Sequence, residues 1–90
     1  MVRVDDNGKI EFPCEFPIKM MGRDTPEFHA TARSLVENHT GPLDDDAVQS
    51  SLSRNGNFVS ITITINASSQ EQLDAIYRDV SSHDDVLMAL

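Results

Sequence analysis

Several residue types are scarce in this chain, and each scarcity excludes a class of protein. The 90 residues include one cysteine, Cys14, so no disulfide can form within the chain. Seven Lys and Arg residues stand against 15 Asp and Glu, for a formal net charge of -8. Nucleic acids and anionic membranes bind clustered basic residues, so this balance argues against both as partners.

Long apolar runs are also missing. No stretch approaches the ~20 apolar residues that cross a membrane. The N-terminal MVRVDDNGK carries acidic residues where a signal peptide has an apolar run. We therefore expect a cytoplasmic protein that binds neither nucleic acid nor membrane.

The clearest pattern that is present is an alternating segment over residues 57–66, NFVSITITIN. Side chains alternate between the two faces of a strand. One face would carry the aliphatic set Val59, Ile61, Ile63 and Ile65. The other would carry Phe58, Ser60, Thr62 and Thr64. The segment predicts a central strand with one buried face and one wetter face.

An earlier strand is predicted over residues 16–21, ended by Gly22. A helix should follow, capped by Asp24 or Thr25 and stopped by Gly41-Pro42. Its apolar stripe has helical spacing and comprises Phe28, Ala32, Leu35 and Val36.

Residues 47–54 predict a polar edge strand joined to the central one by a hairpin. A two-residue turn at Asn55-Gly56 would set Leu52 opposite Val59 and Val48 opposite Ile63. All apolar members of the pair would then share one face.

Ser68 and Glu71 have the spacing of a capping box and predict the start of a second helix. Its apolar stripe is Leu73, Ile76, Tyr77 and Val80. A last strand is predicted over Val86 to Leu90, with Val86, Met88 and Leu90 inward and Leu87 and Ala89 outward. An apolar outer side at a sheet edge indicates a weak homodimer or a partner that covers Leu87.

The element order is βαββαβ. Two amphipathic helices on one face of a four-stranded antiparallel sheet, in strand order 4-1-3-2, would bury every apolar stripe. This is an α+β, ferredoxin-like sandwich. We expect a flexible lead-in over residues 1–11 and a single domain over residues 12–90.

Patterns that carry chemistry are weak. The loop after the first strand has no CxxC, the acids at 44–46 lack the spacing of a calcium loop, and the three histidines are far apart. Cys14 lies beside Glu15, which disfavours a thiolate. The sequence indicates no metal site, no cofactor and no catalytic residues.

Two segments carry a family resemblance. The runs EFPCEFPIKMMGRDTPEF, residues 11–28, and NFVSITITINASSQEQLDAIY, residues 57–77, resemble the YbeD-like family of small bacterial proteins. The matching motifs are Phe12-Pro13, Lys19 to Gly22 and Ser60 to Ala67. The resemblance implies a fold similar to the ACT regulatory domains and a lipoate-linked regulatory role, and it supplies no catalytic residues.

These observations favour a non-catalytic regulatory or interaction module that senses a small carboxylate, such as an amino acid or lipoate, or binds an unknown protein partner. An enzyme of unrecognised type is the alternative. The predicted site is Gly22, Arg23, Asp24 and Thr25, where a helix N-terminus and an arginine would attract a carboxylate, and Gly22 would admit it close to the backbone.

Overall fold

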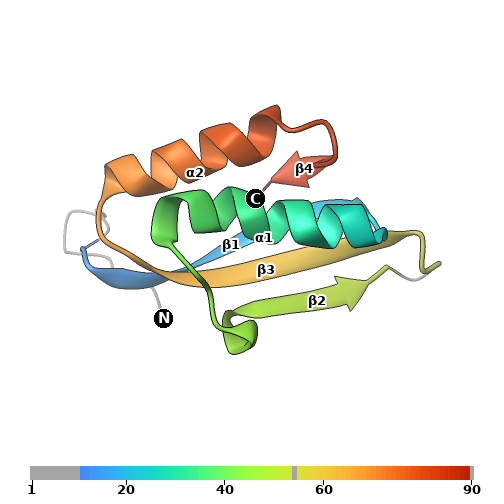
Figure 1. The fold of residues 1–90 in the computed structure, drawn as a ribbon, viewed down its shortest axis with the longest axis horizontal. Coiled ribbons are helices and arrows are strands. Elements are labelled where there is room, and N and C mark those ends of the chain that lie inside the picture. Colours follow the sequence, from blue (N-terminus) through green and yellow to red (C-terminus); the bar gives the residue numbers. More distant parts are fainter. Residues whose placement is uncertain (1–10, 54, 90) are drawn as a thin grey trace.

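A four-stranded antiparallel sheet carries two helices on one face in the computed structural model, which describes residues 11–53 and 55–89 (Figure 1). The elements in chain order are β1 (Cys14–Arg23), α1 (Pro26–Thr40), the 3-10 helix η1 (Asp45–Ala47), β2 (Val48–Leu52), β3 (Phe58–Ala67), α2 (Gln70–Ser82) and β4 (Met88–Ala89).

The strand order is β2-β3-β1-β4, which is the predicted order read from the opposite edge. The ferredoxin-like, ACT-like fold is therefore confirmed. The lead-in predicted over residues 1–11 lies outside the described residues except for Glu11.

The β1–β3 pair is the centre of the sheet. Ten residue pairs join the two strands without interruption, from Cys14 opposite Ala67 to Arg23 opposite Phe58. Gly22 was predicted to end the first strand, and this is wrong. Pairing continues to Arg23, and the backbone N–H of Asp24 then donates to the carbonyl of Asn57 at 3.1 Å.

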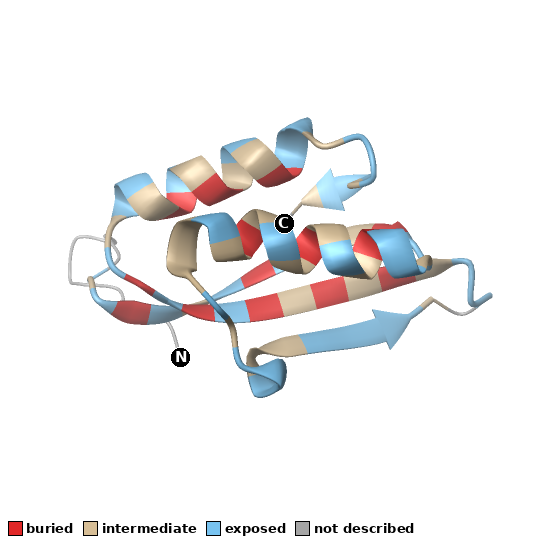
Figure 2. Cartoon of the chain, viewed as in Figure 1, coloured by how far each residue is buried: buried red, intermediate tan, exposed pale blue. Residues whose placement is uncertain are grey.

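The two faces of β3 differ as the alternation predicts. Figure 2 shows buried residues at every second position along the strand. Ile63 is fully buried and Ile61 is 1% exposed, whereas Thr62 between them is half-buried and Thr64 is exposed. The buried set joins apolar residues of both helices and of β1 into one core. Its largest members are Phe28, Ile18, Met20, Ile61, Ile63, Leu73, Ile76, Val36, Val59 and Val80.

Both helices turn the predicted stripes toward the core, where Leu35 and Tyr77 are only partly buried, but one cap was assigned wrongly. Thr25 caps α1, its Oγ1 accepting from the N–H of Phe28 at 3.1 Å. The cap of α2 is Ser69, whose Oγ accepts from the N–H of Gln72 at 3.1 Å. Ser68 and Glu71 were predicted for this role. Ser68 instead donates its N–H to Oε1 of Gln72, at 2.8 Å.

The hairpin has the predicted register and a different turn. Leu52 lies opposite Val59 and Val48 opposite Ile63. The turn closes through the N–H of Gly56, which donates to the carbonyl of Ser53 at 3.0 Å. This bond ends the turn at Gly56 instead of centring it on Asn55-Gly56, so the expected two-residue turn is wrong. Gly56 has φ 73°, which glycine adopts without strain.

The last strand is shorter than predicted, and Met88 and Ala89 face the opposite way from the prediction, whereas Val86 packs against the core as predicted. Met20 lies opposite Ala89 and Met21 opposite Met88. Because Met20 is buried, Ala89 faces the core and Met88 the open side. The N–H of Leu87 donates to the carbonyl of Met21 at 2.8 Å and fixes this register. The expected position of Leu90 lies outside the described residues.

Candidate functional site

The four predicted site residues lie where β1 ends and α1 begins, beside the loop that joins α2 to β4. Two of them, Arg23 and Thr25, line a surface cavity of about 180 Å³. The other lining residues are Phe28, Asp84, Asp85 and Leu87. The cavity thus brings together the ends of two loops that are far apart in the sequence.

Gly22 serves packing at this place. A Cβ on Gly22 would lie 2.6 Å from the carbonyl oxygen of Asp85 and 2.7 Å from the ring of Phe28. Both distances are shorter than van der Waals contact, so only glycine fits. The space that was expected to admit a ligand is filled by the protein itself.

Asp24 and Thr25 are engaged locally. Oδ1 of Asp24 lies 2.8 Å from Nε2 of His29. The hydroxyl of Thr25 accepts from the N–H of Phe28, and the following Pro26 has no N–H to offer. The helix N-terminus therefore keeps few donors for an anion, and Arg23 is the cation that lines the cavity.

Asp84 and Asp85 are the residues that sequence reasoning missed. Both are exposed and lie on the wall shared with Leu87. The N–H of Asp85 donates to Nδ1 of His83 at 3.1 Å, which orders the loop. The predicted strand order already contained a signal for them. An antiparallel last strand beside the first brings the loop before it next to the end of the first strand.

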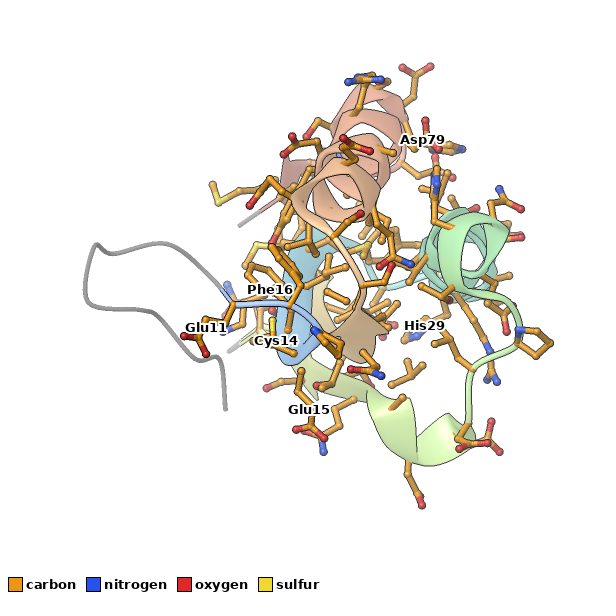
Figure 3. The ribbon with its side chains drawn as sticks, turned by 90° about the vertical axis from the view of Figure 1, so that its left-hand side faces the viewer. Glu11, Cys14, Glu15, Phe16, His29 and Asp79 are labelled. Carbon is orange, nitrogen blue, oxygen red and sulfur yellow. The ribbon has the colours of Figure 1, made fainter. Side chains whose placement is uncertain are left out.

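Another polar pair joins the two helices. Nε2 of His39, in the last turn of α1, lies 2.5 Å from Oδ2 of Asp79 on α2. Figure 3 shows Asp79 on the side of α2 that faces α1. Nε2 of Gln72 also donates to the carbonyl of His39, at 3.0 Å. The three residues tie the helices together.

Candidate metal ligands do not gather in the described part of the chain. Within residues 11–53 and 55–89 no group of three His, Cys, Asp or Glu side chains is placed to hold an ion. Cys14 lies at the start of β1, 7% exposed, opposite Ala67. Among these residues, no helix has the length and apolarity to cross a bilayer.

A two-layer sandwich with one bare sheet face and a cavity between its loops defines a small α+β domain of the ferredoxin-like, ACT-like class. Within that class, the chain belongs to the family described as protein of unknown function (DUF493), whose model matches residues 7–90. The family match confirms the resemblance to YbeD-like small bacterial proteins.

Relatives cover nearly the whole chain. A UPF0250 protein of Paraburkholderia phytofirmans is 42% identical over 80 residues, which are 89% of this chain and 90% of the relative. UPF0250 protein NE1487 of Nitrosomonas europaea is 41% identical over 81 residues, 90% and 93% of the two chains.

A solved structure has the same fold. The solution structure of protein HP0495 from H. pylori matches with a TM-score of 0.71 and 22% sequence identity, over 91% of this chain and 86% of that one. At this sequence identity the match shows the fold alone. These matches assign no ligand, no connection with lipoate and no reaction to this chain.

Proposed function

We propose that this protein is a non-catalytic, cytoplasmic ligand-sensing module that binds an α-amino acid with an apolar side chain. The observation that carries the proposal is the arrangement of the cavity lining. It combines a cation, Arg23, with a pair of carboxylates, Asp84 and Asp85, and with the apolar surfaces of Phe28 and Leu87.

An amino-acid zwitterion presents the complementary groups. Its carboxylate would accept two hydrogen bonds from the planar guanidinium of Arg23. Its ammonium would lie against Asp84 and Asp85, and its side chain would cover Phe28 and Leu87. A simple carboxylate such as lipoate has no ammonium, so it would face two negative charges without compensation.

The lining also favours binding over catalysis. Thr25 carries the one hydroxyl among the six lining residues, and that hydroxyl is committed to the helix cap. Ligand binding would join the α2–β4 loop to the start of α1. Because two residue pairs join β1 to β4 within residues 11–53 and 55–89, such a bridge would change the stability of this edge of the sheet. A change of this kind is what a regulatory module needs.

Four probes test the proposal. Leucine carries both charged groups, 4-methylpentanoate lacks the ammonium, leucinamide lacks the carboxylate, and lipoate represents a plain carboxylate. In an NMR titration we expect leucine to shift the amides of residues 22–28 and 84–87, and the other three to bind at least tenfold more weakly. Equal binding of leucine and 4-methylpentanoate, or shifts confined to other residues, would contradict the proposal.

Variants place the interaction on named side chains. Arg23→Gln and Asp85→Asn should each remove the thermal stabilisation that leucine provides, which grows as RT ln(1 + [L]/Kd). Arg78→Gln is the matched control, because Arg78 is an exposed cation on α2 that does not line the cavity. Unchanged stabilisation in Arg23→Gln would exclude the guanidinium as the carboxylate partner.

A further inference from the structure

The sheet face opposite the helices carries a shallow trough. Two hollows, of about 210 and 250 Å³, adjoin along the strands and share Ser51 and Ser60 in their walls. The first is bordered by Met21, Leu52 and Phe58. The second adds Lys19, Gln49, Ser50 and Thr62. We call the combined surface the open-face trough.

The trough has an apolar end and a cationic end. Met21 and Phe58 are half-buried and face the open side. Leu52 only borders the hollow, because its pairing with the buried Val59 turns its side chain toward the helix side of the sheet. Lys19 is the one charged side chain that lines either hollow, and it is exposed and forms no ion pair with any described residue. Hydroxyls of Ser60 and Thr62 and the amide of Gln49 surround its end of the trough.

The register sets the spacing between the two ends. Lys19 and Met21 lie two residues apart on one face of β1, so their side chains emerge about 7 Å apart. An anionic group and an apolar group at this separation would meet both ends together. Side chains two positions apart on an extended segment, or four apart on a helix, have about this spacing.

We propose that the open-face trough is a docking site for a partner protein, through a segment that carries an acidic side chain two or four positions from Leu, Met or Phe. The acidic group pairs with Lys19 and the surrounding hydroxyls, and the apolar group covers Met21 and Phe58. This site is separate from the amino-acid cavity and goes beyond the function proposed for it.

Charge decides between this occupant and a second copy of the chain. Two-fold pairing through the trough would bring the two Lys19 ammonium groups toward each other, in molecules that each carry a net charge of -8. An acidic segment meets a cation instead. The acidic residues of the helix layer lie on the far side of the sheet. At physiological salt, charges are screened beyond about 8 Å, so a segment in the trough interacts mainly with the nearby Lys19.

Selection from a phage-displayed library of random 12-residue peptides tests the proposal without assuming a partner. We expect the full-length chain to enrich peptides with Asp or Glu two or four positions from Leu, Met or Phe. The selected peptide should shift the amides of Lys19, Ser51, Ser60 and Thr62 in NMR spectra.

Charge variants complete the test. Lys19→Glu should weaken the selected peptide about tenfold, and Lys19→Gln by a smaller factor. Arg78→Glu makes the same change of charge on α2 and should leave the affinity within about twofold. No enrichment, enriched peptides without acidic residues, equal losses in Lys19→Glu and Arg78→Glu, or binding that shifts amides outside the trough would each overturn the proposal.

Discussion

At the scale of single residues, Gly22 couples two parts of the chain. The Phe28 ring and the Asp85 carbonyl both occupy the position that a side chain would take. The start of α1 and the α2–β4 loop can therefore approach β1 together. The amino-acid cavity forms where these three segments meet.

Gly22→Ala should destabilise the fold by about 1–3 kcal/mol, because a methyl group must displace backbone and a packed ring. Urea unfolding with a reading of the midpoint measures the loss. Gly56→Ala is the comparison, since its Cβ would meet nothing and only its positive φ costs about 1 kcal/mol. A Gly22→Ala variant as stable as the wild type would show that this packing yields easily.

Tyr77 offers a residue-scale test of burial. It contacts the ring of Phe16 edge-on, with centroids 6.3 Å apart. Burial raises the pKa of the Tyr77 phenol above its ordinary value. Because the sequence has one tyrosine and no tryptophan, ultraviolet titration reports this group alone.

The phenolate should appear at higher pH in the folded protein than in the protein unfolded in guanidinium. Its contribution to stability is fully present below the unfolded pKa, about 10, and is lost as pH rises through the folded pKa. If the titration curves of the folded and unfolded protein coincide, the phenol of Tyr77 is not buried enough to change its pKa.

At the scale of elements, strand faces follow from alternation and element ends do not. The aliphatic face of β3 could be predicted because every second residue is apolar, and one register alone aligns it with β2. The turn could not be predicted from Asn55-Gly56, since the pair Ser53 and Phe58 has the same pairing sum as the expected two-residue turn.

The cap of α2 could not be predicted for a similar reason. Ser68 and Ser69 are each followed three residues later by a residue that can reach back, Glu71 and Gln72. The choice depends on where β3 ends, and the buried Ala67 closes that strand. The faces of Met88 and Ala89 depend on the hydrogen bond from the N–H of Leu87 to the carbonyl of Met21, a long-range contact that no local pattern encodes.

Two of the six residues that line the cavity, Arg23 and Thr25, could be predicted as site residues from the sequence. Gly22 to Thr25 stand out locally as a strand end before a helix start. Asp84 and Asp85 come from the far end of the chain, and only the three-dimensional order of strands brings them to Arg23. Whether the four predicted residues bind a ligand stays a prediction.

Removal of the α2 cap should distinguish the two serines. Ser69→Ala should cost about 1 kcal/mol of stability because the N–H of Gln72 loses its acceptor. Ser68→Ala should cost less, since its backbone N–H still reaches Gln72. Chemical denaturation of both variants measures the difference. A larger loss in Ser68→Ala would return the cap to the position first predicted.

Charge on either face of β3 should have opposite outcomes. Ile61→Asp or Ile63→Asp would bury an unpaired carboxylate in the core, and we expect neither variant to fold stably. Thr62→Asp places the charge on the open face and should be tolerated far better. Circular dichroism with thermal melts compares them, and equal loss in Thr62→Asp and Ile61→Asp would contradict this assignment of the two faces.

At the scale of the whole molecule, apolar exposure and net charge act against each other. Leu87 is 56% and Met88 is 52% exposed, both at the β4 edge of the sheet. Apolar surface there favours association, whereas a net charge of -8 on each copy opposes it.

We expect a weak homodimer that strengthens as salt is added, because screening reduces the repulsion between copies. Sedimentation or light scattering over a range of protein concentration and ionic strength measures this. Leu87→Ser with Met88→Ser should abolish it. A chain that stays monomeric at millimolar concentration in high salt would rule out the homodimer.

The long β1–β3 pairing has a consequence for how the chain is made. Cys14 meets Ala67, so the ribosome delivers one strand of the central pair long before the other. Until β3 emerges, the apolar side chains of β1 and α1 have no sheet to cover and are open to chaperones or to aggregation. Folding must wait for these distant contacts, so we expect this mixed α+β chain to fold more slowly than a helical bundle of its size.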